Sequence, residues 1–257
     1  MGKLVVKRLR RASLLGSVLL PVILLVACSP TPPKAASILL FDGSGTSPGD
    51  VAAIEAVMKA GGYDYATANS RQLDAMSAAD LKAYRLLIIP GGNFVTMGQG
   101  LSSATPPKVR QSVKGGLNYL GICAGAFLAG NTPANGLYNG LNLTEGVRFR
   151  FYAVSGQGVS KAAVKVRTVG MTAVDQYWED GPQLSGWGDV VARYEDGTPA
   201  VAEGKVGAGF VVLSGVHPEA PDSWRKGLSF TTPASIDNAY AAQLVKAALN
   251  GVPLPHY

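Results

Sequence analysis

The sequence predicts an α/β fold with a mostly parallel β-sheet, and three observations support this prediction. From residue 37 onward, short apolar runs of strand length alternate with stretches of helical periodicity. Most of these runs are apolar throughout, which is typical of strands in a parallel sheet that helices cover on both faces. The chain has 257 residues, of which 47% are hydrophobic and 16% are charged, enough for one large α/β domain or two small ones.

Four runs in the first half of the chain predict strands. The clearest is RLLIIPGG, because its apolar residues are followed at once by a proline and a glycine turn. LNYLGIC has the same buried character, and YDYATAN alternates between apolar and polar residues. Strands are therefore expected at residues 37–43, 63–69, 85–92 and 117–123.

Three helices are expected between these strands. Residues 49–62 carry apolar side chains on one helical face and end in Gly-Gly, a common helix stop. Residues 76–84 place Ser77 three positions before Asp80, a spacing typical of a helix N-terminus. Residues 106–116 start with prolines and end with glycines, the asymmetry expected of a helix.

The second half of the chain has a different pattern. Segments within residues 147–216 alternate between apolar and polar residues and are separated by glycine turns. This pattern predicts antiparallel hairpins added to the parallel sheet. Residues 235–251 are amphipathic and end in glycine, so a closing helix is expected there. We interpret residues 38–252 as one domain, because the sequence has no internal repeat and no second linker.

The N-terminus indicates export and lipid attachment. A basic segment precedes an apolar run at residues 12–27, which is short for a membrane span of about 20 residues. The run ends in LVAC, which resembles the lipobox of bacterial lipoproteins. Residues 1–27 are thus a predicted lipoprotein signal peptide, and Cys28 is the predicted lipidated residue. Residues 28–37 are rich in proline, serine and alanine and suit a tether.

This interpretation predicts an exported protein held on a bacterial membrane by lipid, facing the periplasm or the cell surface. Two alternatives stay open. The segment could be a plain signal peptide or an uncleaved anchor with an incidental cysteine. The pair Arg10-Arg11 also leaves twin-arginine export possible.

The distribution of charge argues against a nucleic-acid partner, although the net charge is +6. Five basic residues lie before residue 12, with no acidic residue among them. From Cys28 onward, 18 Lys and Arg residues face 17 Asp and Glu residues. The basic character therefore belongs to the N-terminus and not to a binding face.

Cys123 is the first candidate for chemistry. It follows a predicted buried strand within GICAG, residues 121–125, and a helix-like run begins after it. Glycines on both sides of a nucleophile allow a sharp strand-to-helix turn, and the helix start favours the thiolate. Ligands also bind at the carboxyl ends of parallel strands. The alternative is an inert, buried small residue, since glycine is abundant in this chain.

A cysteine nucleophile needs a base, and the chain has only two histidines. His256 is next to the C-terminus, where we expect it to be exposed. His217 comes directly after an apolar strand, and Glu219 follows two residues later, on the same side of an extended backbone. Glu219 could therefore hydrogen-bond the imidazole and fix its tautomer, as the third group of a triad does. The alternative is a His-Pro turn with a solvated glutamate.

An acyl-transfer site also needs donors for an oxyanion. The backbone N–H of Ala124, just after the nucleophile, is one candidate. The glycine turn IIPGGN supplies Gly91 and Gly92 as further oxyanion or substrate-binding candidates, unless it is an ordinary turn. No cofactor is expected, and two cysteines do not suffice for a structural zinc site, so no metal is expected.

Two weaker signals concern the surroundings of Cys123. The loop GSGTSPG, residues 43–49, only partly matches a dinucleotide loop because Pro48 replaces its third glycine. We expect this loop to line the Cys123 pocket instead. Tyr177, Trp178 and Glu179 are expected to line the same pocket, with simple packing as the alternative.

Three motifs together resemble a known family. A strand followed by PGG, then GxCxG, then HPE is the layout of class I glutamine amidotransferase-like domains, over most of residues 38–225. LLFDGSGTS, DQYWEDGP and the segment 191–219 look most like the domain at the N-terminus of some biotin-protein ligases, which also occurs as free-standing bacterial proteins. The resemblance implies a flavodoxin-like three-layer α/β/α sandwich with Cys123, His217 and Glu219 as a triad.

The resemblance does not extend to biotin ligation, because the sequence has no Gly-Arg-Gly-Arg type loop for biotinyl-adenylate and no room for a ligase domain. The expected function is a cysteine hydrolase or amidase that acts on an amide or acyl substrate, either a small molecule or a peptide. The alternatives are a binding or scaffold protein without turnover and an oxidant-sensing thiol.

Overall fold

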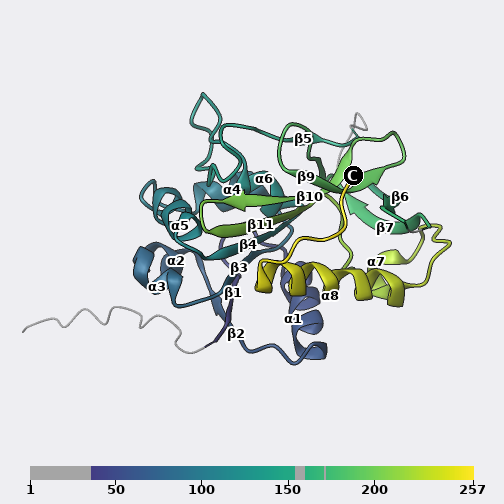
Figure 1. Ribbon diagram of the computed structural model, residues 1–257, viewed down its shortest axis with the longest axis horizontal. Coiled ribbons are helices and arrows are strands. Elements are labelled where there is room, and N and C mark those ends of the chain that lie inside the picture. The colour runs from purple at the N-terminus through teal and green to yellow at the C-terminus, as the bar shows by residue number, and fades with distance from the viewer. Residues whose placement is uncertain (1–35, 154–159, 171) are drawn as a thin grey trace, which may run out of the picture.

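A nine-stranded sheet forms the centre of the computed structural model, which describes residues 36–153, 160–170 and 172–257 (Figure 1). The strand order is β2-β1-β3-β4-β11-β10-β9-β6-β7. Neighbours from β2 to β11 are parallel, and neighbours from β11 to β7 are antiparallel. The predicted mostly parallel sheet with added antiparallel strands is therefore confirmed.

The parallel half consists of short, buried strands. They are β1 (Ile38–Phe41), β2 (Tyr65–Ala68), β3 (Leu86–Ile89), β4 (Asn118–Ile122) and β11 (Gly209–Ser214). Successive side chains point to opposite faces, so Leu39 and Phe41 pack in one core and Ile38 and Leu40 in the other. Both faces of this half are therefore apolar and need helices to cover them.

Two helices cover one face and several shorter helices cover the other. On the first face lie α1 (Pro48–Ala60) and α8 (Ala234–Asn250), which pack against each other (Figure 1). The second face is covered by α2 (Ser70–Ala75), α3 (Ala78–Lys82), α4 (Phe94–Gln99), α5 (Thr105–Lys114) and α6 (Ala124–Ala129). The result fits the expected flavodoxin-like α/β/α sandwich.

The antiparallel half carries the remaining long strands. They are β6 (Lys161–Thr168), β7 (Val174–Glu179), β9 (Asp189–Tyr194) and β10 (Pro199–Val206). A separate small sheet pairs β5 (Arg150–Phe151) with β8 (Pro182–Gln183), and the short helix α7 (Asp222–Arg225) follows β11. This half brings β7 and the segment after β11 together, where Tyr177 and His217 form an isolated bridge.

Most of the expected elements are present, but some short helices were not predicted and one strand has a different place. The short helices α2, α4 and α7 were not predicted, because they have only six, six and four residues and no clear periodicity. The segment that becomes β11 was expected in an added hairpin. It does pair with β10, but it also extends the parallel half through β4. Its six residues are all buried, as a central strand requires.

The predicted signal peptide, the lipidation site Cys28 and most of the tether lie outside the residues that the structure describes. Within the described part of the chain, no helix has both the length and the apolar character needed to cross a membrane.

Candidate functional site

Cys123 occupies a sharp turn between β4 and α6. Its backbone has φ +48° and ψ −103°, a conformation that residues other than glycine rarely adopt. The Cys123 N–H donates to the carbonyl of Ser214 in β11 at 2.7 Å, which fixes the turn to the sheet. Strained backbone of this kind persists where the surrounding structure enforces it, and it is concentrated at functional sites.

The glycines of GICAG are required by close packing. A Cβ on Gly121 would come within 2.6 Å of the Gly125 carbonyl oxygen, and one on Gly125 would collide with the carbonyl oxygen of Ile89 in β3. Both neighbours are backbone atoms that cannot rotate away. The glycine spacing thus lets α6 start directly against β3 and β4, with Cys123 at the turn.

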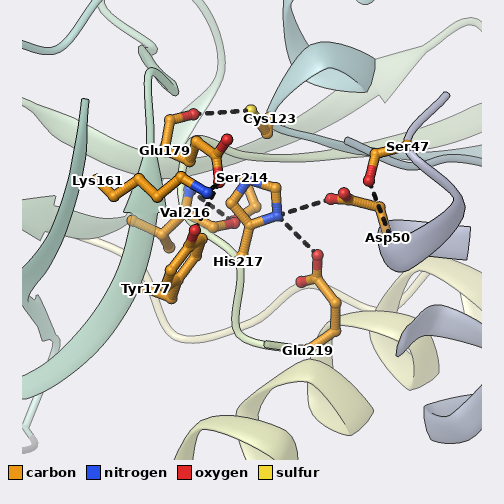
Figure 2. Close-up of polar contacts among 10 residues, drawn as sticks. All are labelled: Ser47, Asp50, Cys123, Lys161, Tyr177, Glu179, Ser214, Val216, His217 and Glu219. Carbon is orange, nitrogen blue, oxygen red and sulfur yellow. Dashed lines mark hydrogen bonds and ion pairs between the residues drawn. The ribbon is translucent and has the colours of Figure 1, made fainter. Parts of the chain in front are cut away.

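His217 and Glu219 meet in the buried loop after β11. The backbone N–H of His217 donates to the backbone carbonyl of Tyr177 at 2.8 Å, which ties the loop to β7. Nδ1 of His217 lies 2.8 Å from Oε1 of Glu219, in hydrogen-bond geometry (Figure 2). The exposed fractions of His217 and Glu219 are 3% and 2%, so water does not compete for this contact. The sequence-predicted pair is brought together.

A second carboxylate, which was not identified from sequence, reaches the same imidazole. Oδ1 of Asp50 lies 3.0 Å from Nδ1 of His217 (Figure 2). Asp50 is in the first turn of α1, where Ser47 caps the helix and accepts a hydrogen bond from the Asp50 N–H. An acidic residue in a first helical turn is common because it complements the helix dipole. Because its position has this ordinary explanation, nothing in the sequence indicated that Asp50 contacts His217.

The charges around His217 determine its protonation. Burial alone would lower the pKa of His217, because it disfavours the charged ring. The Cys123 sulfur and the two carboxylates outweigh burial and hold the pKa of His217 well above the usual value for histidine. Because Nδ1 faces the carboxylates, the other ring nitrogen is left for Cys123. The arrangement favours an imidazolium next to the Cys123 sulfur.

The two carboxylates respond differently to their surroundings. Burial raises the pKa of Asp50, but His217 and Ser47 outweigh burial and leave it below the usual value. Burial also raises the pKa of Glu219, and there the attraction of His217 does not compensate. Asp50 is thus the carboxylate that more readily carries a negative charge, although Glu219 is the closer one.

A cavity of about 520 Å³ opens over Cys123 and His217. It is lined by Ser47, Gly49, Asp50, Gly92, Cys123, Lys161, Tyr177, Glu179, His217, Ser223, Trp224 and Lys226. The loop before α1 therefore contributes to this cavity, as expected from sequence. The lining is mostly polar and carries charges of both signs, so it suits a polar ligand.

The wall opposite Asp50 comes from β6 and β7. The Cys123 Sγ donates to the Glu179 carbonyl at 3.5 Å, and the Glu179 carboxylate accepts from Tyr177 Oη at 2.5 Å and pairs with Lys161 at 3.2 Å (Figure 2). Tyr177 and Glu179 thus line the cavity. The expectation was wrong for Trp178, because neighbouring strand residues face opposite sides and Trp178 packs in the core.

The oxyanion candidates occupy three different places. Gly92, with φ +138°, lines the cavity. Gly91 packs behind it, where a Cβ would collide with the Asp50 carboxylate and lie 2.6 Å from His217. Ala124 is the first residue of α6 and is 1% exposed, and its N–H belongs to the first turn, where amides lack partners within the helix.

Asp50, His217 and Glu219 also invite comparison with a metal centre, because their possible donor atoms lie within 4.8 Å of one another. The Nδ1 atom, however, is 2.8 Å from Glu219 and 3.0 Å from Asp50. Ligand atoms around a tetrahedral zinc ion, with bonds of about 2.0–2.1 Å, lie roughly 3.3 Å apart. The shorter separations are those of a hydrogen-bonded imidazole, and we assign the cluster that role.

Fold and site together define a class: an α/β/α protein with a cysteine at a strand-to-helix turn beside a buried histidine and its carboxylates. Residues 36–160 match the sequence model of the family described as "Biotin-protein ligase, N terminal". The match spans just under half of the chain, includes Cys123 and Asp50, and ends before His217. It supports the glutamine amidotransferase-like family of biotin-protein ligase N-terminal domains for this part of the chain. No curated protein matches the chain.

Solved structures with a similar fold have low sequence identity. The cytoplasmic protein STM3548 from Salmonella typhimurium is 13% identical, with a TM-score of 0.50, and the match covers 82% of this chain and 98% of that one. The GH42 β-galactosidase Gan42B of G. stearothermophilus is 12% identical, with a TM-score of 0.51 and coverage of 86% and 31%. A β-galactosidase from Bacillus circulans sp. alkalophilus is 12% identical, with a TM-score of 0.51, and the match covers 82% of this chain and 31% of that one. The chain thus spans about a third of either β-galactosidase, and these likenesses show the fold alone.

Proposed function

We propose that this protein is a cell-envelope lipoprotein that works as a cysteine hydrolase or amidase of the glutamine amidotransferase-like class. The observation that carries the proposal is the placement of His217. Its Nδ1 is held by Glu219 at 2.8 Å, and its charge is coupled to the sulfur of Cys123, which sits in a strained strand-to-helix turn. A nucleophile, a base and a group that orients the base are the parts that acyl transfer requires.

In the first half of the proposed reaction, the Cys123 thiolate attacks the carbonyl carbon of the substrate. The S–C bond forms, and the C=O π electrons move to the oxygen. The N–H groups of Gly92 and Ala124 are the proposed donors to that oxyanion. When the intermediate collapses, the C–N bond breaks and His217 gives its proton to the leaving amine. The products of this half are a free amine and a thioester on Cys123.

In the second half, water hydrolyses the thioester. The neutral His217 takes a proton from the attacking water as the new C–O bond forms and the C=O π electrons move to the oxygen. When this intermediate collapses, the C–S bond breaks. The thiolate and the imidazolium are restored, and the acid leaves. The net reaction adds one water to one amide and gives an acid and an amine. Glu219 keeps the ring oriented while His217 alternates between acid and base.

A non-catalytic binding or scaffold protein is the alternative, because a fold of this kind hosts many functions. The two can be separated with p-nitrophenyl acetate, an activated acyl substrate that needs little specific recognition. We expect the full-length chain in detergent to hydrolyse it faster than a Cys123→Ala variant at pH 7. Cys28 is the same in both proteins, so it cannot cause the difference. Equal rates, with no acetyl group found on Cys123 by mass spectrometry, would favour the scaffold.

The lipid anchor rests on the motif LVAC and is tested separately. We expect the full-length chain, expressed in a bacterium that matures lipoproteins, to incorporate radiolabelled palmitate. A Cys28→Ala variant is expected to lose the label, whereas Cys123→Ala keeps it. Persistent label on the Cys28→Ala protein would contradict lipidation at this residue.

A further inference from the structure

Asp50 is the buried charged group of the site that the proposed Cys-His-Glu triad does not use. It belongs to α1, while Glu219 follows β11 far along the chain. The exposed fraction of its side chain is 8%, and its Oδ1 lies 3.0 Å from Nδ1 of His217. The two carboxylates thus approach one imidazole nitrogen from different elements, as Figure 2 shows.

The two carboxylates do not share the ring nitrogen equally. The hydrogen-bond geometry is satisfied toward Oε1 of Glu219, at 2.8 Å. Oδ1 of Asp50 makes only the ion-pair contact and has no hydrogen-bond partner, although it is buried. A buried carboxylate oxygen without a hydrogen bond is costly unless a positive charge is close. His217 in its charged form is that positive charge.

The remaining groups around His217 do not replace Asp50. The rings of Tyr177 in β7 and Trp224 in α7 pack edge-on against the imidazole, with centroids 5.8 Å away. Four ionisable groups interact with the ring: Asp50 from α1, Glu219 from its own loop, Cys123 from the turn after β4 and Tyr177 from β7. Glu179 from β7, Lys161 from β6 and Lys226 after α7 line the same cavity. Lys161 and Tyr177 are engaged with Glu179, which leaves Asp50 as the second negative charge at Nδ1.

We infer that Asp50 is a positioning residue whose role is electrostatic. Together with Cys123 and Glu219, it holds His217 in the charged form, while Glu219 also fixes the orientation of the ring. The structure around Asp50 supports this division. Ser47 caps α1 and anchors the Asp50 backbone, and Gly91 leaves the space that the Asp50 carboxylate fills against His217. The pKa of Asp50 is also lowered by His217 against the effect of burial.

The inference rests on the proposed Cys-His pair but can be tested without turnover. The chain has only two histidines, so ¹⁵N-histidine labelling of the full-length protein gives two imidazole spin systems. A His256→Gln variant assigns them. The imidazole signals of His217 are then followed by NMR from pH 5 to 10. This titration does not depend on turnover, so it tests the role of Asp50 whether or not the protein is active.

The decisive comparison is Asp50→Asn against Asp64→Asn. Asp64 is exposed and lies before β2, so its variant removes a carboxylate without touching the site. We expect Asp50→Asn to lower the His217 titration midpoint by about one pH unit or more, the usual effect of losing a close opposite charge. Asp64→Asn should leave the midpoint unchanged. An Asp50→Asn midpoint equal to that of the parent would overturn the inference.

Two further variants keep the test decisive if Asp50→Asn fails to fold. Asp50→Glu keeps the charge, so it should keep a raised midpoint. Glu219→Gln removes the other carboxylate, and His217 should still titrate well above an ordinary histidine because Asp50 and the Cys123 sulfur remain. If the Glu219→Gln midpoint falls to that of an ordinary histidine, near pH 6.5, the charge that matters is on Glu219 and the inference is wrong.

Discussion

Nδ1 of His217 and Oε1 of Glu219 lie 2.8 Å apart in a part of the loop that is almost completely buried. This contact fixes the plane of the imidazole, so that its other nitrogen is left for Cys123. Glu219 thus supplies orientation as well as charge, whereas we infer that Asp50 supplies charge alone. The two functions lead to different predictions for the two carboxylates.

A Glu219→Gln variant should lose activity while keeping a charged His217. The amide has the same shape as the carboxylate, but its NH₂ group can turn toward Nδ1 and disturb the ring. We expect the rate of p-nitrophenyl acetate hydrolysis to fall at least about tenfold, since losing the orienting group of a triad is costly. An unchanged rate, in a protein whose circular dichroism matches the parent, would show that Glu219 does not orient His217.

Gly91→Ala should damage the site without removing any catalytic group. The new Cβ would collide with the Asp50 carboxylate and lie 2.6 Å from Cε1 of His217. We expect slower alkylation of Cys123 at pH 6 and a thermal midpoint only a few degrees lower, since overpacking costs about 1–3 kcal/mol. Gly62→Ala is a suitable control, because its Cβ would meet no atom within 4 Å, although its φ of +67° adds some strain. Parent-like alkylation in Gly91→Ala would contradict this packing.

Glu203 provides a prediction about stability that is independent of the site. It is 1% exposed, accepts from the Leu254 N–H at 2.8 Å and has one oxygen without a partner. Burial is the main reason that the pKa of Glu203 is raised to about 7. The folded state therefore binds a proton that the unfolded state has already released between about pH 4.5 and 7. Stability from this residue is present below that window and is lost as the pH rises through it.

A Glu203→Gln variant should remove this loss, because glutamine resembles the protonated acid and can still accept from Leu254. We expect similar melting temperatures for variant and parent at pH 5, and a variant that is about 2–6 °C more stable at pH 8. Calorimetry or circular dichroism melts at the two pH values measure this difference. A difference that does not change with pH would mean that Glu203 keeps an ordinary acidity in the folded protein.

The residues predicted from sequence were those in short contiguous motifs. Cys123 could be identified because its two glycines have a steric reason that can be stated from sequence, and Glu219 because it lies two residues from His217. Asp50 could not be identified in the same way. It reaches His217 through the packing of α1 against the sheet, and its position in a first helical turn already has an ordinary explanation.

The elements of the fold that could be predicted were also those with a clear local sequence pattern. Strands that are apolar throughout, such as LLII in β3, were evident from sequence. The short helices α2 and α4 were not, because a segment of six residues shows less than two helical turns of periodicity. Trp178 was misplaced because the direction of each side chain depends on the register of β7, which hydrogen bonds to β6 determine.

The most direct test of the central claim, that Cys123 and His217 form a working pair, is alkylation by iodoacetamide from pH 4 to 10. The full-length chain in detergent is used, and modification of the peptide that contains Cys123 is quantified by mass spectrometry, so Cys28 does not interfere. A thiol with the ordinary pKa of about 8.5 is less than about 1% ionised at pH 6. We predict rapid alkylation at pH 6 in the parent that is lost in His217→Ala. Equal rates in the two proteins at pH 6 would contradict the pair.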